Sequence, residues 1–187
     1  AAEVAAVQER ITTALGSSIT AIEAVYVPSD DLTDPAVVCI SSYLDQVLVL
    51  SRERVQMGLY PAIDPLLSSS AHLNDTVVGA RHYRIAQQTL ALLKRHEQLR
   101  RIVAVIGIEE LPRQDQVLFN RARRLQNFLT QPFFTAQLYT GKPGHYVSVE
   151  QTLNGCERVL AGDYDEQPED ALYMIGAYLA ATLAQAT

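Results

Sequence analysis

The chain has 187 residues, of which 48% are hydrophobic and 19% are charged, and its formal net charge is -6. This composition supplies a core for one domain, or for one domain and part of another, and it excludes a mainly disordered chain. Every apolar run is shorter than the about 20 residues needed to cross a bilayer, and no basic-then-apolar leader is visible. We therefore expect a soluble chain that meets a membrane only through partners.

The first 50 residues predict a mixture of helices and strands. Residues 3–11 have helical apolar spacing without a capping residue ahead of them, which we interpret as a truncated start. Residues 19–27 are rich in branched side chains and predict a buried strand that ends at Pro28. A short helix over residues 36–45 and a buried parallel strand over residues 47–50 follow. This order indicates the trailing edge of an open α/β sheet.

The second part of the chain predicts helices. A polar connection around Asn74 marks a domain boundary near residue 75, which gives domains over residues 1–75 and 76–187. Amphipathic spacing favours a helix over residues 78–101, and Pro112 begins another that must stop at Gln131, before a proline. Two more helices are predicted over residues 149–160, ended by Gly162, and over residues 168–185. Together they predict a small helical bundle.

No metal site is predicted. The two cysteines are far apart in sequence, no two histidines have i, i+4 spacing, and no histidine lies at metal-ligand spacing from a cysteine. The aspartates at positions 30, 31 and 34 stand beside prolines and a threonine, as turn and cap residues do. The cysteines and histidines concerned are Cys39, Cys156, His72, His82, His96 and His145.

Positive charge is concentrated in residues 81–124. Ten Arg or Lys against four acids give this stretch +6, and the remainder of the chain carries 5 minus 17, or -12. A basic helical stretch can bind nucleic acid, but no binding motif accompanies it. We therefore favour a solvated or subunit-facing helix surface and expect no nucleic-acid partner.

Two motifs rich in prolines and aspartates distinguish this chain. Tyr-Val-Pro-Ser-Asp-Asp-Leu-Thr-Asp-Pro begins at Tyr26, and Gly-Leu-Tyr-Pro-Ala-Ile-Asp-Pro-Leu begins at Gly58. On these motifs, and on three shorter segments, the chain resembles the beta subunit of F-type ATP synthases over essentially its whole length. The resemblance implies an α/β plus all-α fold, with trailing strands of a RecA-like P-loop nucleotide-binding domain and then a C-terminal helical bundle. The further matching segments are residues 11–13, 129–133 and 160–165.

The resemblance also implies an adenine pocket. Tyr60 occupies the place of the family's adenine-stacking tyrosine, and Phe133, Ala136 and Tyr139 match the residues that enclose the base from the helical domain. Tyrosine at position 139 replaces the commoner phenylalanine and adds a hydroxyl. From spacing alone these aromatics could equally be core residues at a domain junction. The other two matches near nucleotide are Tyr26 and Tyr83.

Residues 109–115 match the acidic lever that contacts the rotating stalk in this family. Pro112 replaces a serine of the family motif, and Arg113 and Gln114 replace two acids. The local charge therefore changes from -5 to -2. Two further departures, Ala71 and Gln87, replace family arginines and indicate a divergent branch. The lever residues are Glu109, Glu110, Leu111, Pro112, Arg113, Gln114 and Asp115.

No Gly-x-x-x-x-Gly-Lys-Ser/Thr phosphate loop occurs in the sequence. The chain is therefore interpreted as a C-terminal fragment with no catalytic residue, inactive alone, of a proton- or sodium-transporting ATP synthase or ATPase. In the intact subunit the resemblance implies ATP or ADP with magnesium, and we expect neither to bind tightly to the fragment. It further implies alternating alpha subunits and a gamma stalk as partners, on the cytoplasmic side of an energy-transducing membrane reached through the ion-translocating sector.

Two alternatives remain from the sequence. A separately made, non-catalytic helical module could bind adenine weakly or dock other subunits. An alpha-type, secretion or termination ATPase would share the core fold, although the two proline-rich motifs favour the beta type.

Overall fold

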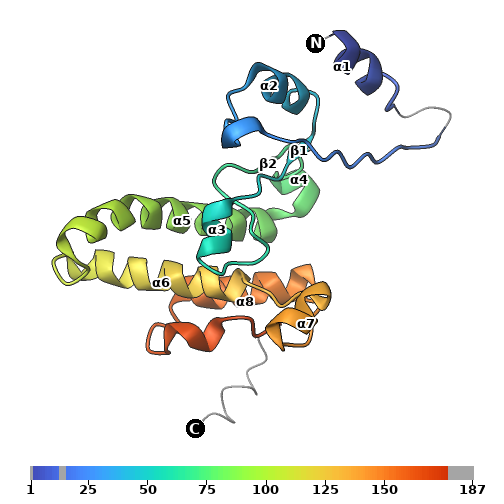
Figure 1. Cartoon of the computed structure of the whole chain (residues 1–187). Helices are drawn as coiled ribbons and strands as arrows, with labels where there is room; N and C mark the ends of the chain where they lie inside the picture. The colour runs from blue at the N-terminus through green and yellow to red at the C-terminus, as the bar shows by residue number, and fades with distance from the viewer. Residues whose placement is uncertain (1, 13–15, 177–187) are drawn as a thin grey trace. The chain divides into compact units, whose positions relative to one another are not determined.

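The structure is a computed structural model that describes residues 2–12 and 16–176. The chain divides into two compact units, Ala1–Val47 and Leu48–Thr187, and each is described by itself. Figure 1 follows the chain from the N-terminal unit to the helical unit.

The first unit contains short helices joined by extended chain. Its elements are α1 (Ala2–Gln8), a 3-10 turn η1 (Pro28–Asp30), α2 (Pro35–Ser41) and the two-residue β1 (Gln46–Val47). The strand predicted over residues 19–27 is wrong, because this segment is extended but has no strand assignment, and Ile22 is 96% exposed. A strand needs neighbouring backbone to satisfy its amides and to cover its side chains, and the described residues supply none along this segment.

The aspartates of this unit have local structural roles, as the sequence predicts. Asp34 is the N-cap of α2 and accepts hydrogen bonds from the amides of Ala36 at 2.8 Å and Val37 at 3.3 Å. Asp31 accepts from the amide and hydroxyl of Thr33 at 2.9 and 2.6 Å, and these bonds lower the pKa of its carboxyl group. Both carboxylates are thus engaged with their own loop.

The second unit begins with a hairpin-like segment. Leu50 pairs with Ile63 in an antiparallel bridge, and the amide of Asp64 donates to the carbonyl of Val49 at 2.8 Å. Between them lies α3 (Arg52–Gln56), whose first turn is capped by the Ser51 side chain. The prediction of a buried parallel strand over residues 47–50 is wrong. Among these residues strand pairing is limited to Val47, in β1, and to the antiparallel bridge of Leu50, and both Leu48 and Leu50 are exposed.

Helices make up the remainder of this unit. Figure 1 shows α5, α6 and α8 side by side, with contacts between each pair. The predicted start at Pro112 and the predicted ends before Pro132 and at Gly162 are confirmed to within two residues. The elements are β2 (Ser69–Ser70), α4 (Asp75–Val78), α5 (Ala80–Ile106), α6 (Arg113–Leu129), η2 (Phe134–Ala136), α7 (Gln137–Thr140), α8 (Val149–Ala161) and η3 (Glu169–Leu172).

The predicted helix over residues 168–185 is wrong where the structure describes it. A 3-10 turn ends at Leu172, Tyr173 is extended, and Met174 and Gly176 have positive φ of 55° and 72°, which a continuous helix does not allow. The part of this prediction beyond residue 176 lies outside the described residues.

The core of the second unit has two apolar clusters. The larger one joins α5, α6 and α8 around Phe128 and Leu125, and the tyrosine ring of Tyr164 packs into it. The smaller cluster, near the turn between α5 and α6, consists of Leu99, Leu111 and Phe119. The chain therefore buries separate apolar groups at the middle and at the far end of the α5–α6 hairpin.

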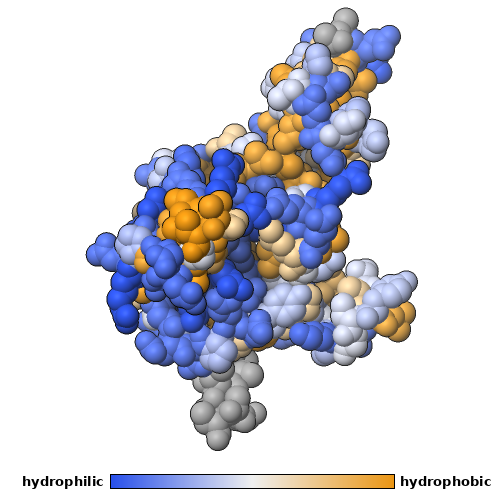
Figure 2. Space-filling view, turned by 60° about the vertical axis from the view of Figure 1, so that its left-hand side comes forward, coloured by the Kyte–Doolittle hydropathy of each residue, from blue (hydrophilic) through white to orange (hydrophobic). Residues whose placement is uncertain are grey.

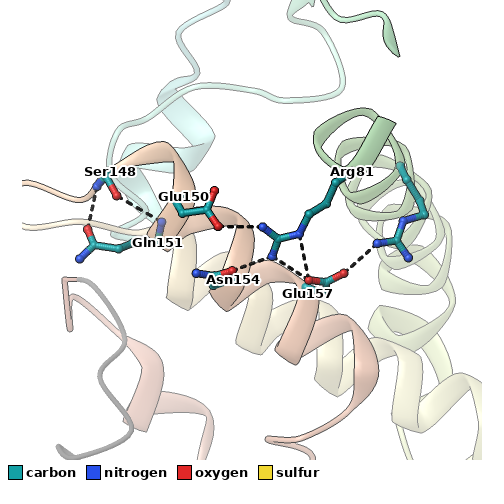
Figure 3. Close-up of polar contacts among 7 residues, drawn as sticks. Arg81, Ser148, Glu150, Gln151, Asn154 and Glu157 are labelled. Atoms are coloured by element: carbon teal, nitrogen blue, oxygen red, sulfur yellow. Dashed lines mark hydrogen bonds and ion pairs between the residues drawn. The ribbon is translucent and has the colours of Figure 1, made fainter. Parts of the chain in front are cut away.

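Most of the basic residues between positions 81 and 124 form ion pairs with acids of the same chain. Arg81 at the start of α5 binds Glu150, Asn154 and Glu157 of α8, as Figure 3 shows. These bonds raise the pKa of Arg81 and lower that of Glu157. The other basic residues that pair with acids are Arg84, Arg95, Arg100, Arg121 and Arg123.

Candidate functional site

The candidate nucleotide-contacting surface starts with the loop after α3. Gly58 has a left-handed φ of 73°, and its carbonyl accepts a hydrogen bond from the hydroxyl of Tyr173 at 2.7 Å. A Cβ at this position would meet that hydroxyl oxygen at 3.2 Å, so the turn favours glycine both by φ and by space. The loop is thereby fixed just before Tyr60, whose side chain is half-buried.

A second segment is attached directly to this loop. The amide of Gln131 donates to the carbonyl of Tyr60 at 2.7 Å, and two residues further on the ring of Phe133 contacts the Tyr60 ring edge-on. The ring centroids are 6.4 Å apart with an interplanar angle of 77°, the preferred T-shaped arrangement of aromatic pairs. The structure thus brings together two of the four pocket residues that the sequence nominates.

The other two nominated residues lie further along the same segment. Ala136 ends η2 and is half-buried, whereas Tyr139 lies on α7 and is 91% exposed. Within the described part of the chain, no ring contact joins Tyr139 to Tyr60 or Phe133. The exposed face of this segment also carries Phe134, Leu138 and Tyr146.

Three residues that shape this surface are absent from the sequence-based prediction. A Cβ on Gly144 would collide with the backbone of Phe134, so glycine permits the close approach of these two segments of the chain. Lys142 places its ammonium group 5.2 Å from the centroid of the Tyr173 ring. The glycine between Pro143 and His145 was the one sequence signal available for this close approach. Tyr173 contacts residues far away in the sequence, and no local pattern indicates such a contact.

The sequence also nominates Tyr26 and Tyr83. Tyr26 belongs to the first unit and is 82% exposed. Tyr83 lies near the start of α5 and is partly exposed, and among the described residues its ring makes no contact with the ring of Tyr60.

The predicted lever forms the turn between α5 and α6. Glu109 and Glu110 are exposed, Leu111 is buried in the smaller apolar cluster, and Pro112 precedes the first residue of α6. Asp115 is held by Arg95, with N–O distances of 2.9 and 3.0 Å. One of the acids of the lever is therefore neutralised within the chain.

Exposed apolar side chains occur on both helices next to this turn. Figure 2 shows an apolar patch where α5 ends, and Val105 is 84% exposed there. The neighbouring exposed apolar residues are Ile102, Ile106 and Val117. The end of the hairpin is thus a mixed surface, more apolar than its sequence motif suggests.

Titratable groups elsewhere in the described residues give little sign of acid–base chemistry. Burial raises the pKa of the Cys156 thiol to about 12, so it stays protonated at neutral pH. Across residues 2–12 and 16–176, no group of three His, Cys, Asp or Glu side chains could hold a metal ion. No helix in these ranges is both long and apolar enough to cross a membrane.

A shallow cavity of about 330 Å³ opens between the segment after Asp64 and the middle of α5. Its wall is mostly apolar, with Ser68, Gln87 and Lys94 as its polar residues. Gln87 is one of the positions where the sequence departs from the family arginine, so the structure assigns this substitution to the surface of α5.

Comparison with known proteins places this geometry in a class. Residues 1–70 match the family model of the ATP synthase alpha/beta family, nucleotide-binding domain, and residues 72–167 match that of the C-terminal domain of V and A type ATP synthase. The solved structure of the ATP synthase subunit NeqB from Nanoarcheaum equitans superposes with a TM-score of 0.69 at 22% identity, covering 86% of this chain and 38% of that one. The assembled ATPase EscN of the enteropathogenic E. coli type III secretion system gives a TM-score of 0.67 at 26% identity, covering 85% and 37%. These neighbours confirm the predicted fold class, that of ATP synthase and related ATPase subunits.

Curated relatives narrow the class. ATP synthase subunit beta 1 of Pseudoalteromonas atlantica is 51% identical over 174 residues, which are 93% of this chain and 32% of the relative. ATP synthase subunit beta 2 of Cereibacter sphaeroides is 51% identical over 184 residues, or 98% of this chain and 39% of the relative. The chain belongs to the ATP synthase alpha/beta family, and the predicted resemblance to its beta subunits is confirmed. It spans about a third of the length of these relatives.

Proposed function

We propose that this chain contributes the adenine-binding and coupling region of the catalytic beta subunit of a rotary ATP synthase or ATPase. The single observation that carries the proposal is the attachment of Gln131 and Phe133 to the Tyr60 loop. It fixes two aromatic rings next to each other on adjoining segments of the helical unit. The relatives named as ATP synthase beta subunits support this assignment.

In the proposed site Tyr60 stacks on the adenine ring and Phe133 closes one edge of it. Base–aromatic stacking contributes about 1–3 kcal/mol and needs a ring held in a fixed orientation. The main-chain bond to Gln131 and the T-shaped contact supply that orientation for Tyr60. Ala136 and Tyr139 complete the pocket in the proposal, and the high exposure of Tyr139 makes its surface available to the ligand. Magnesium would accompany the phosphates, and no ligand to it is proposed from this chain.

The α5–α6 turn is proposed to contact a central gamma-type stalk in the assembled complex. With Asp115 already paired to Arg95, the exposed charges of the lever are those of Glu109, Glu110 and Arg113, which sum to -1. The surrounding patch at Val105 is apolar. The contact should therefore depend on shape and apolar burial more than on attraction between opposite charges. Alpha subunits as ring neighbours, and a peripheral position on an energy-transducing membrane, belong to the same proposal.

The test compares Tyr60→Ala with Tyr60→Phe in the assembled complex. Loss of stacking should raise the KM for ATP by between about fivefold and about 150-fold while kcat changes little. Tyr60→Phe keeps the ring and serves as the matched control, with a KM within about twofold of the parent value, since it retains the stacking face. Equal KM values for the alanine variant and the parent would contradict the proposal.

A further inference from the structure

His96 lies buried beneath the α5–α6 turn, in a place where the activity proposed above gives it no role. Its side chain is 7% exposed, and its ring stacks on Phe119 of α6 with centroids 4.6 Å apart and an interplanar angle of 28°. Phe119 belongs to the smaller apolar cluster with Leu99 and Leu111, the residue that anchors the turn. The imidazole is therefore part of the contact that joins the far end of α5 to α6.

The neutral form of this imidazole suits its surroundings and the protonated form does not. Its Nε2 atom is buried and has no hydrogen-bond partner among the described residues. A proton taken up from solvent at this nitrogen would create a buried N–H donor and a positive charge without an acceptor. The energetic penalty falls on the α5–α6 contact, because opening that contact is what would expose the nitrogen to water.

The charged groups around His96 also disfavour a positive charge on its ring. Arg100 on α5, Arg123 on α6 and Arg54 on α3 each lower its pKa, and Glu97 on α5 is the single neighbour that raises it. Burial is the largest cause, and the pKa falls from an ordinary 6.5 to about 4. Glu97 is already engaged in an ion pair with Arg100, so it is poorly placed to compensate a new charge.

We propose that His96 makes the end of the α5–α6 hairpin acid-sensitive, so that its protonation loosens the turn carrying residues 107–112. The direction of the effect follows from the lowered pKa of His96. The turn is fully stable above pH 6.5 and loses stability as the pH falls from 6.5 towards 4. In the coupling role proposed above, a loosened turn transmits less force to its partner. The structural claim itself stands independently of that role.

Linkage gives the size of the effect. With the closed-state pKa near 4 and an ordinary value of 6.5 in the open state, opening should increase about tenfold between pH 8 and pH 5.5. It should increase about 30-fold by pH 5. These changes are confined to local opening if the larger cluster around Phe128 remains closed.

The experiment is amide hydrogen exchange of the 187-residue chain at pH 7, 6 and 5.5, with rates corrected for intrinsic exchange. Between pH 7 and pH 5.5 we expect peptides covering residues 107–119 to lose about eightfold protection in the parent chain, while peptides from α8 do not. His96→Phe retains a ring that can stack on Phe119 and should remove the pH dependence. His72→Gln, a change at an exposed histidine, is the matched control and should behave like the parent.

A direct titration keeps the proposal falsifiable if His96→Phe does not fold. The ring-proton signal of His96 in the parent chain should titrate well below pH 6.5. An ordinary titration near 6.5, or equal loss of protection in His96→Phe and in the parent, would overturn the proposal. Neither readout requires nucleotide or a rotary partner, so failure here and failure of the nucleotide proposal are distinguishable.

Discussion

Replacing Gly155, in the middle of α8, with alanine should lower the free energy of unfolding, which is the opposite of the usual effect of Gly→Ala in a helix. Glycine in a helix interior is ordinarily less stable than alanine by about 1 kcal/mol, so Gly→Ala normally stabilises. Here the new Cβ would lie 2.6 and 2.7 Å from the Cε2 and Cε1 atoms of Phe128, and closer still to Cζ. Phe128 is 1% exposed in the larger cluster, so its ring has little room to move.

The magnitude follows from these two opposing effects. Overpacking a close-packed core costs about 1–3 kcal/mol, and the near-immobile ring favours the upper end of that range. After subtraction of the helix-propensity gain of about 1 kcal/mol, we expect Gly155→Ala to lower the free energy of unfolding by about 2 kcal/mol. In a chain of this size that corresponds to a fall in Tm of about 4–8 °C.

Thermal and urea unfolding, followed by circular dichroism, measure this change. The double variant Gly155→Ala with Phe128→Leu should be more stable than the sum of the two single changes predicts, because the smaller side chain accommodates the added methyl group. We expect a coupling energy of at least about 1 kcal/mol. An unchanged or raised Tm in Gly155→Ala would refute the reasoning and show that α6 and α8 are not this closely packed.

Two further predictions concern the thiol of Cys156 and the polar contacts of Arg81. In a Cys39→Ser background, Cys156 should react with a thiol reagent at pH 8 about 1000-fold more slowly in the folded chain than in the urea-unfolded chain. The reason is that burial raises the pKa of its thiol from 9.0 to about 12. Equal rates would contradict this burial. Arg81→Met should lower the free energy of unfolding measurably, and by less in 1 M salt, because its ion pairs are largely exposed. Arg84→Met, which removes a single ion pair with Glu157, is the matched control and should have a smaller effect; a salt-independent loss for Arg81→Met would show that its packing rather than its charge matters.

Helix ends in the second unit were predictable because local chemistry determines them. Pro112 lacks an amide donor and fits the start of α6, and Gly162 adopts the left-handed conformation that ends α8. The strands over residues 19–27 and 47–50 were not predictable in the same way. Strand formation depends on partners distant in sequence, and branched residues alone do not supply them.

The candidate site was predictable in residue type but less so in arrangement. The motif around Tyr60 indicated an aromatic at a loop, and the structure brings Phe133 to it through the backbone of Gln131. The contact of Tyr173 with Gly58 joins segments far apart in the sequence, and no local pattern announces such a bond. Likewise, the stacking of His96 on Phe119 follows from how two helices pack, which residue spacing alone leaves open.

The most direct test of the central claim is to locate where adenine contacts this chain. Adenosine, which lacks phosphates, can be titrated into the labelled chain while the aromatic and methyl NMR signals are followed. The proposed site predicts saturable shifts of the Tyr60 and Phe133 ring signals, with no change at Val105, which lies at the far end of α5. Saturable shifts elsewhere, with the Tyr60 and Phe133 signals unmoved, would contradict the assignment of the adenine site.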